Sequence, residues 1–249
     1  MGNVFFSKQS DFYARYRPVY PNHLYDFISA QVKDKNLVWD VATGNGQAAI
    51  RLSDLFKEVY ATDLSENQLK NAAARPNITY RQEIAESCSL PDVSADLITV
   101  ATAVHWFDKE KFFREADRVL KPGGVLFVWS YGGCRVNEAI DKVMDHFNFE
   151  FLFDYWHAGA KENWDDRYQS LQMPYPLIET PQFVAKANYT MEETMNYMFS
   201  WSGVQEYIRQ TGLNPLETIE QPLTEAWGDP ALKREINGYL HGKCCRKPD

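Results

Sequence analysis

The sequence contains few cysteines and no long apolar run. Its 249 residues include 4 cysteines, and these do not follow the spacing of a metal-binding motif. Cys244 and Cys245 are adjacent, so a disulfide between them would be strained. We therefore expect free thiols, no metal centre and a reducing compartment. No stretch approaches the roughly 20 apolar residues of a membrane span, and the first residues lack a secretory leader. These absences predict a cytoplasmic protein without a membrane partner.

Positive charge is also scarce. The chain has 26 Lys and Arg against 34 Asp and Glu, and its formal net charge is −8. The basic cluster at residues 243–247 lies in the tail, where a solvated end of the chain is the simpler interpretation. Nucleic-acid binding usually depends on a clustered basic surface, so we expect no nucleic-acid partner. A small-molecule partner and a monomer or weak homodimer are predicted.

The most informative segment joins a buried strand to a glycine turn. Residues 37–41 are apolar apart from Asp40, and Gly44 and Gly46 allow a tight bend and close approach of a ligand. The spacing up to Ala49 also matches the dinucleotide pattern G-x-G-x-x-A, which would indicate a nicotinamide oxidoreductase. However, we expect the carboxylate of Asp40 to point into the cleft, where it repels a pyrophosphate and can meet a cationic ligand directly or through water. The turn therefore favours a cationic nucleoside cofactor.

Strand and helix patterns alternate from residue 36 to residue 130, which is typical of a parallel sheet covered on both faces. We predict an α/β, Rossmann-like, doubly wound fold with a mostly parallel seven-stranded sheet. An aromatic-rich helical cap, over about residues 131–180, is inserted after the fifth strand. The predicted strands are 36–41, 58–62, 78–82, 97–101, 125–129, 183–187 and 236–243, with a helix at about 191–210.

The whole chain, residues 1–249, is predicted to be a single domain. Residues 1–35 form an N-terminal helical segment that covers the cofactor, and residues 36–130 form the cofactor-binding core. Residues 131–249 supply the substrate cap and the last strands. Ligands in open α/β sheets bind beyond the carboxyl ends of the strands, so this is where we expect the site.

Asp63 ends the second predicted strand. A carboxylate at this place can accept hydrogen bonds from both hydroxyls of an unphosphorylated ribose. The alternative is that Asp63 caps the helix that begins near Ser65.

The motifs along the core resemble those of class I S-adenosylmethionine-dependent methyltransferases. They cover about residues 36–130 in the order Asp40, Gly44-x-Gly46, Asp63, Ile84-Ala85-Glu86, Asp96-Leu97-Ile98-Thr99 and Leu120-Lys121-Pro122-Gly123-Gly124. The flanks narrow the resemblance to the small-molecule branch called methyltransferase type 11, and within it to the trans-aconitate methyltransferases. These flanks are residues 12–21, residues 103–108 and Trp201-Ser202-Gly203. One departure is Ala42, where the family usually has a glycine.

The resemblance implies S-adenosyl-L-methionine as cofactor, S-adenosyl-L-homocysteine as product and a small-molecule methyl acceptor. It assigns the cofactor to Tyr13, Arg17, Asp40, Ala42, Thr43, Gly44, Gly46, Asp63, Leu64, Ile84, Ala85, Glu86, Ala101 and Thr102. Arg17 suits the cofactor carboxylate. The segment that carries Tyr13 and Arg17 equally suits a docking helix held by Pro18 and Pro21.

The acceptor is expected beside the cofactor, after the fourth and fifth strands and in the cap. The predicted acceptor-binding residues are His105, Trp106, Trp129, Tyr131, Arg135, Trp156 and Trp201. His105 is the candidate catalytic base, and the alternative is a histidine that shapes its own turn. Packing is an alternative role for each aromatic residue, and a solvated position is the alternative for Arg135.

The leading hypothesis is O-methylation of a carboxylate by in-line methyl transfer, because an anionic acceptor needs no base. A phenol O-, N- or C-methyltransferase that uses His105 as base is the alternative within the same class. A nicotinamide oxidoreductase or a non-catalytic cofactor-binding module are alternatives from other classes, and Ala42 is the feature that hints at the module.

Overall fold

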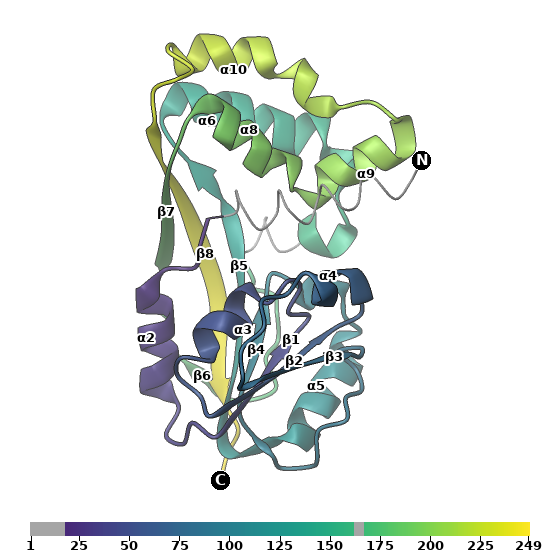
Figure 1. Cartoon of the computed structure of the whole chain (residues 1–249). Helices are drawn as coiled ribbons and strands as arrows, with labels where there is room; N and C mark the ends of the chain where they lie inside the picture. Colours follow the sequence, from purple (N-terminus) through teal and green to yellow (C-terminus); the bar gives the residue numbers. More distant parts are fainter. Residues whose placement is uncertain (1–17, 162–166) are drawn as a thin grey trace. The chain divides into compact units, whose positions relative to one another are not determined.

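The computed structural model describes residues 18–161 and 167–249, so the predicted site residues Tyr13 and Arg17 lie outside the described residues. The chain divides into two compact units. The sheet unit comprises Tyr20–Gly132, Asp165–Phe183 and Leu240–Asp249, and the helical unit includes Gly133–Trp164 and Val184–Tyr239. Three of the boundaries, after residues 132, 183 and 239, fall within strands of the sheet, which Figure 1 labels β5, β7 and β8.

The described residues form one sheet of eight strands, where the sequence predicted seven. The strand order is β3-β2-β1-β4-β5-β8-β6, and β7 also pairs with β8. Neighbours from β3 to β5 run parallel, whereas β6 and β8 are antiparallel. The bounds are β1 Leu37–Val41, β2 Glu58–Asp63, β3 Ile78–Gln82, β4 Ala95–Ala101, β5 Leu120–Arg135, β6 Leu177–Ile178, β7 Phe183–Tyr189 and β8 Arg234–Arg246. The strand absent from the prediction is β6, which has 2 residues and therefore no detectable periodicity.

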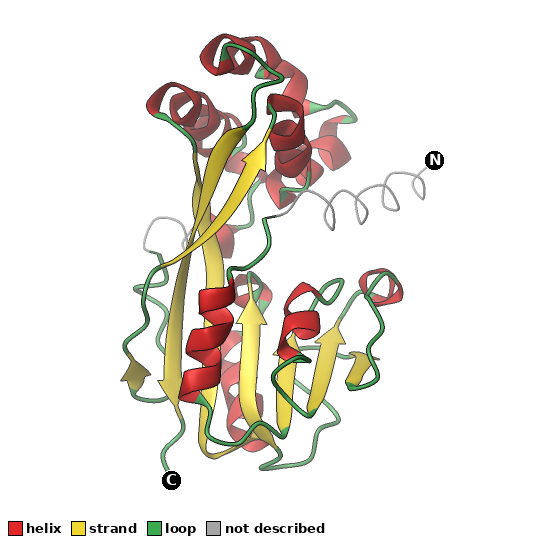
Figure 2. Cartoon of the chain, turned by 60° about the vertical axis from the view of Figure 1, so that its left-hand side comes forward, coloured by secondary structure: helices red, strands yellow, loops and turns green. Residues whose placement is uncertain are grey.

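Helices pack on both faces of the parallel strands, as the strand and helix alternation predicted (Figure 2). One face carries Trp39 and Leu126 and packs against Phe112 in the same apolar cluster. On the other face, the rings of Phe27 and Phe127 lie 5.6 Å apart. The helices are α2 Asn22–Gln31, α3 Gln47–Leu52, α4 Glu66–Lys70, η1 Val104–Trp106 and α5 Lys109–Val119. The predicted Rossmann-like, doubly wound architecture is confirmed.

The helical unit has its own apolar core, centred on buried residues such as Phe147, Met198 and Trp227. The sequence predicted one helix over 191–210, but the structure has two, which are separated at Ser200 and Trp201. The elements are α6 Glu138–His146, η2 Phe147–Phe151, η3 Phe153–Tyr155, α8 Met191–Phe199, α9 Ser202–Thr211, η4 Pro215–Thr218 and α10 Glu220–Trp227. None of the helices in the described ranges combines the length and the apolar character that a bilayer span requires.

Candidate cofactor and acceptor site

The glycine turn follows β1 directly and is fixed by backbone hydrogen bonds. The amide of Thr43 donates to the carbonyl of Thr62 at 2.9 Å, and the amide of Gly46 donates to the carbonyl of Thr43 at 3.0 Å. Gly44 and Gly46 have φ angles of +59° and +84°, which favour glycine. A Cβ on Gly46 would overlap the hydroxyl of Tyr80, whereas a Cβ on Gly44 would meet no atom of the described residues within 4 Å. Gly46 therefore serves packing, and Gly44 leaves space for a ligand.

Asp40 supports this turn from inside the sheet. The carboxylate is fully buried and accepts hydrogen bonds from the hydroxyls of Thr43 at 2.5 Å and Thr99 at 2.7 Å. Burial raises the pKa of Asp40 to about 6, while the two hydroxyl groups oppose this rise and the charge of Asp63 adds to it. We expected this carboxylate to point into the cleft. The structure encloses it, so it can act on a ligand through its charge and through Thr43.

Asp63 connects the end of β2 to the glycine turn. Its Oδ2 accepts from the amide of Gly44 at 2.8 Å, and its Oδ1 accepts from the amide of Ser65 at 2.8 Å. Ser65, not Asp63, caps α4, because the Ser65 hydroxyl accepts from the amide of Gln68 at 3.3 Å. A carboxylate oxygen can accept more than one hydrogen bond, so both oxygens of Asp63 retain capacity for ribose hydroxyls.

Two exposed apolar side chains lie on the loops next to Asp63. The side chains of Leu64 and Ile84 are 68% and 46% exposed. Asp63 pairs in register with Gln82, and the amide of the Gln82 side chain donates to the carbonyl of Leu64 at 3.0 Å. The loops after β2 and β3 therefore start side by side. Exposed apolar groups at this place suit contact with the flat ring of a nucleoside.

The neighbours of Ile84 face other parts of the structure. Ala85 is 8% exposed and belongs to the apolar cluster under α5. The Oε1 of Glu86 accepts a hydrogen bond from the amide of Asp108 at 2.8 Å. Of the three predicted residues Ile84, Ala85 and Glu86, Ile84 thus has the most exposed side chain. Glu86 reaches toward the loop after β4.

Ala101 ends β4, and the next residue, Thr102, has a φ angle of +58°. The amide of Thr102 donates to the carbonyl of Trp129 at 2.7 Å, which places the ends of β4 and β5 together. Trp129 is fully buried, and its Nε1 has no hydrogen-bond partner among the described residues. The ring of Tyr131 stacks on the ring of Tyr20 at 5.4 Å.

Sequence reasoning did not single out Tyr20. Its hydroxyl lies 3.3 Å from the hydroxyl of Thr102, and its ring meets the ring of Trp129 edge-on at 5.6 Å. The signal in the sequence is weak, because Tyr20 is one of several aromatic residues before Pro21. Its contact with β4 and β5 depends on the packing of α2 against the sheet.

The predicted catalytic residue lies on the short helix η1, which follows β4. The rings of His105 and Trp106 have centroids 5.3 Å apart, and Trp106 is 55% exposed. Both residues thus lie beyond the carboxyl end of β4, where an acceptor would meet the cofactor in this fold.

The remaining predicted acceptor residues belong to the helical unit. Arg135 donates to the carboxylate of Asp145 at 2.7 Å. The rings of Trp156 and Trp201 lie 6.2 Å apart. A Cβ on Gly203 would come within 2.6 Å of the Trp156 ring. Close packing by Trp156 thus accounts for the glycine in Trp201-Ser202-Gly203, and a role of these side chains in acceptor binding stays a prediction.

The four cysteines are free, as predicted. Burial raises the pKa of each thiol to about 12. A thiol with such a pKa is almost entirely protonated at neutral pH and is a poor nucleophile. The thiols are therefore not candidate nucleophiles of the site.

Fold and site together define a class of enzyme. A parallel sheet with the order β3-β2-β1-β4-β5 is followed by an antiparallel strand pair. A glycine turn after β1 is held by an acidic residue at the end of β2. This arrangement is that of a class I S-adenosylmethionine-dependent methyltransferase.

Comparisons with known proteins agree with this class. The family described as "Methyltransferase domain" matches residues 39–128. A Dictyostelium discoideum protein described as a methyltransferase is 32% identical over 225 residues, which are 89% of this chain and 86% of that protein. UbiE of Cronobacter sakazakii, a ubiquinone/menaquinone biosynthesis C-methyltransferase, is 32% identical over 180 residues, which are 67% of this chain and 70% of that protein.

A solved structure covers nearly the whole chain. A protein from Anaeromyxobacter dehalogenans, named as a type II methyltransferase, superimposes with a TM-score of 0.83 at 30% identity, covering 94% of this chain and 99% of that one. The chain belongs to the S-adenosylmethionine-dependent methyltransferases, in the type 11 branch that the sequence resemblance indicated.

Proposed function

We propose that this enzyme binds S-adenosylmethionine at the carboxyl ends of β1, β2 and β4 and methylates a carboxylate oxygen of a small molecule. The arrangement around Asp63 is the main support for the cofactor site. Asp63 holds the amide of Gly44 at 2.8 Å, and Leu64 beside it is 68% exposed. One carboxylate thus shapes the glycine turn, keeps lone pairs for a ribose and adjoins an apolar surface for the adenine.

The cofactor supplies a methyl group that is already activated by the positive sulfur. The protein then has to align the acceptor behind this methyl group and exclude water. Ala101 and Thr102 form the floor next to the reacting centre, and Trp106 covers its acceptor side. A carboxylate is anionic at neutral pH, so His105 orients it as a hydrogen-bond donor and need not remove a proton.

C-methylation is the second candidate, and similarity to UbiE favours it. A carbon acceptor must lose a proton in the course of the reaction, either from a neighbouring hydroxyl before methyl transfer or from the methylated carbon after it. In this reaction His105 acts as the base. Phenol O-methylation and N-methylation also require His105 to remove a proton from the acceptor.

Calorimetry tests the cofactor. We expect binding heat with S-adenosylmethionine and with S-adenosylhomocysteine, and none with NADH. Replacement of Asp63 by Ala should weaken S-adenosylhomocysteine binding by about 1.5–3 kcal/mol, because charge-assisted hydrogen bonds are lost. Asp54→Ala is the matched control, since Asp54 is an exposed acid that pairs with Arg51 on α3. Absence of heat with both sulfur compounds would refute the proposed cofactor.

Product chemistry tests the acceptor. Carboxylic acids, phenols and quinols are incubated with methyl-labelled cofactor, and the products are treated with mild alkali. A methyl ester releases labelled methanol, whereas a C-methyl product retains its label. His105→Ala should lower carboxylate methylation in part, because an orienting hydrogen bond is lost, and should abolish phenol or carbon methylation, because the base is lost. Label that stays in the product after alkali would exclude a methyl ester and replace the carboxylate proposal with methylation of carbon or of a phenol oxygen.

A further inference from the structure

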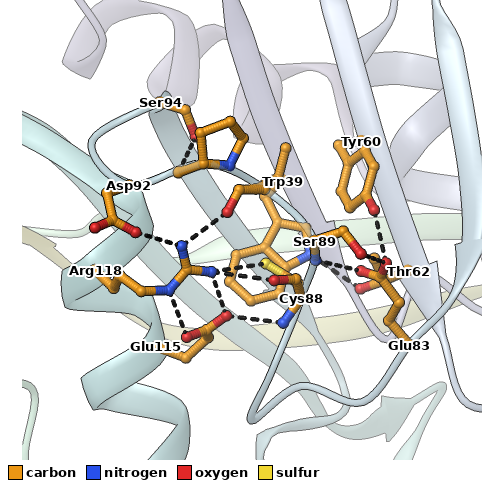
Figure 3. A network of polar contacts seen from close by, with 12 residues as sticks. Trp39, Tyr60, Thr62, Glu83, Cys88, Ser89, Asp92, Ser94, Glu115 and Arg118 are labelled. Atoms are coloured by element: carbon orange, nitrogen blue, oxygen red, sulfur yellow. Dashed lines mark hydrogen bonds and ion pairs between the residues drawn. The ribbon is translucent and has the colours of Figure 1, made fainter.

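The loop between β3 and β4, which carries Ile84 and Glu86, is anchored to α5 by one arginine (Figure 3). The guanidinium of Arg118 donates to the carbonyls of Cys88 and Leu90 at 3.1 and 2.8 Å. It also pairs with Asp92 at 2.7 Å and with Glu115 at 2.6 Å. Two backbone carbonyls and one carboxylate of the loop therefore share a single anchor on a helix.

Glu83 fixes the beginning of the same loop, also drawn in Figure 3. Its Oε1 accepts from the hydroxyl of Tyr60 at 2.9 Å and from the hydroxyl of Ser89 at 2.5 Å. Its Oε2 accepts from the amide of Ser89 at 3.1 Å. Hydrogen bonds thus anchor both ends of the loop to the sheet or to α5. Glu86 lies between the two anchored ends.

Glu86 reaches out of this anchored loop to the neighbouring one. Its Oε1 accepts the amide hydrogen of Asp108 at 2.8 Å. Asp108 is also the N-cap of α5, because its own carboxylate accepts from the amide of Lys111 at 3.2 Å. The segment with His105 and Trp106 therefore ends at a residue that is held both by α5 and by Glu86.

We propose that Glu86 is a positioning residue that couples the nucleoside side of the site to its acceptor side. The inference rests on the proposed function. A nucleoside seated against Ile84 restrains the loop after β3. Because that loop is anchored at both ends, the restraint passes through Glu86 to the amide of Asp108. Cofactor binding thus steadies His105 and Trp106 before the acceptor arrives, and this favours binding of the cofactor first.

Hydrogen exchange of the whole chain with and without S-adenosylhomocysteine tests this coupling. In the wild type, the ligand should slow exchange in residues 84–87 and in residues 103–108. In Glu86→Ala, protection of 84–87 should remain, whereas protection of 103–108 should fall about tenfold through loss of a charged hydrogen bond. Calorimetric affinity for S-adenosylhomocysteine should change by less than about threefold, since the nucleoside contacts remain.

Two variants separate the hydrogen bond from other effects. Glu86→Gln keeps an oxygen that can accept from Asp108 and should behave as the wild type. Glu110→Ala is the matched control, because Glu110 is an exposed acid on α5 that pairs with Arg114 at 2.6 Å. Ligand protection of 103–108 that persists in Glu86→Ala, or that never occurs in the wild type, overturns the coupling. Absence of ligand binding in the wild type overturns the proposed function itself, and the inference with it.

Discussion

Two residues at the edge of the site have a left-handed backbone conformation although neither is a glycine. Ala42 after β1 has a φ angle of +52°, and Thr102 after β4 has a φ angle of +58°. Such conformations cost L-residues free energy and are often found at functional sites. The sequence showed Ala42 as a departure from the family's usual glycine. The structure explains why glycine is usual there, and it shows that the chain accepts the alanine without losing the turn.

Replacement of Ala42 by Gly should therefore leave the stability equal or higher. The substitution relieves about 1–2 kcal/mol of left-handed strain in the folded chain. Glycine also raises the conformational entropy of the unfolded chain, which reduces this gain by about 0.4–1 kcal/mol. Urea unfolding should show a gain between zero and about 1.6 kcal/mol. Ala48→Gly, on α3, is the control and should lose about 1 kcal/mol. A loss of similar size at Ala42 would contradict the strain argument.

Asp40 should make the stability depend on pH. Burial raises its pKa to about 6 in the folded chain, so the folded state binds a proton more readily than the unfolded state. The ionised Asp40 therefore lowers the free energy of unfolding at pH 7, and this free energy rises as the pH falls from about 6 to about 4. Relative to Asp40→Asn, the wild type should gain about 2 kcal/mol of unfolding free energy between pH 7 and pH 4. Parallel urea-derived stability profiles for the two proteins would rule this out.

Among the elements, the parallel strands were predictable and some boundaries were not. The strands at 37–41 and 78–82 follow directly from short apolar or β-branched runs. In contrast, β5 begins at Leu120, although Pro122 and the two following glycines indicate a turn. Leu120 pairs with Ala95 of β4, and the amide of Gly123 donates to the carbonyl of Lys247 at 3.0 Å, so this extension depends on partners in other parts of the chain. Local patterns cannot reveal such pairing.

The packing of α9 also depends on a residue distant in the sequence, and Gly203 tests this dependence. A Cβ at Gly203 would approach the Trp156 ring to 2.6 Å. Gly203→Ala should therefore cost about 1–3 kcal/mol through overpacking, despite the better helix propensity of Ala. Ser202→Ala is the neighbouring control and should have a small effect. In urea unfolding followed by circular dichroism, the loss should shrink when Trp156→Leu is added. An equal loss with and without Trp156 would show that overpacking against the Trp156 ring is not the cause.

For the whole molecule, the sequence predicted where the cofactor residues would meet, because parallel strands present their carboxyl ends at one edge of the sheet. The contacts of Asp63 with Gly44 and Ser65 join the ends of β1 and β2 at this edge, and the binding of a cofactor there stays a prediction. Tyr20 could not be found in this way, since its contact with Thr102 depends on how α2 packs. The enclosure of Asp40 by two threonine hydroxyls was also hidden, because Thr99 is brought beside it by strand register.

Ligand binding should stabilise the folded chain as a whole. A ligand that binds the folded state alone at 100 times its dissociation constant adds about 2.7 kcal/mol. For a chain of this size, S-adenosylhomocysteine should then raise the thermal midpoint by about 5–10 °C. NADH at the same concentration should leave the midpoint unchanged. Asp63→Ala should lose most of the shift, whereas the control Asp54→Ala should keep it, because Asp54 lies on the loop after α3 and pairs with Arg51. An equal shift in Asp63→Ala and the wild type would show that the ribose is bound by other groups, and the site would have to be sought away from the end of β2.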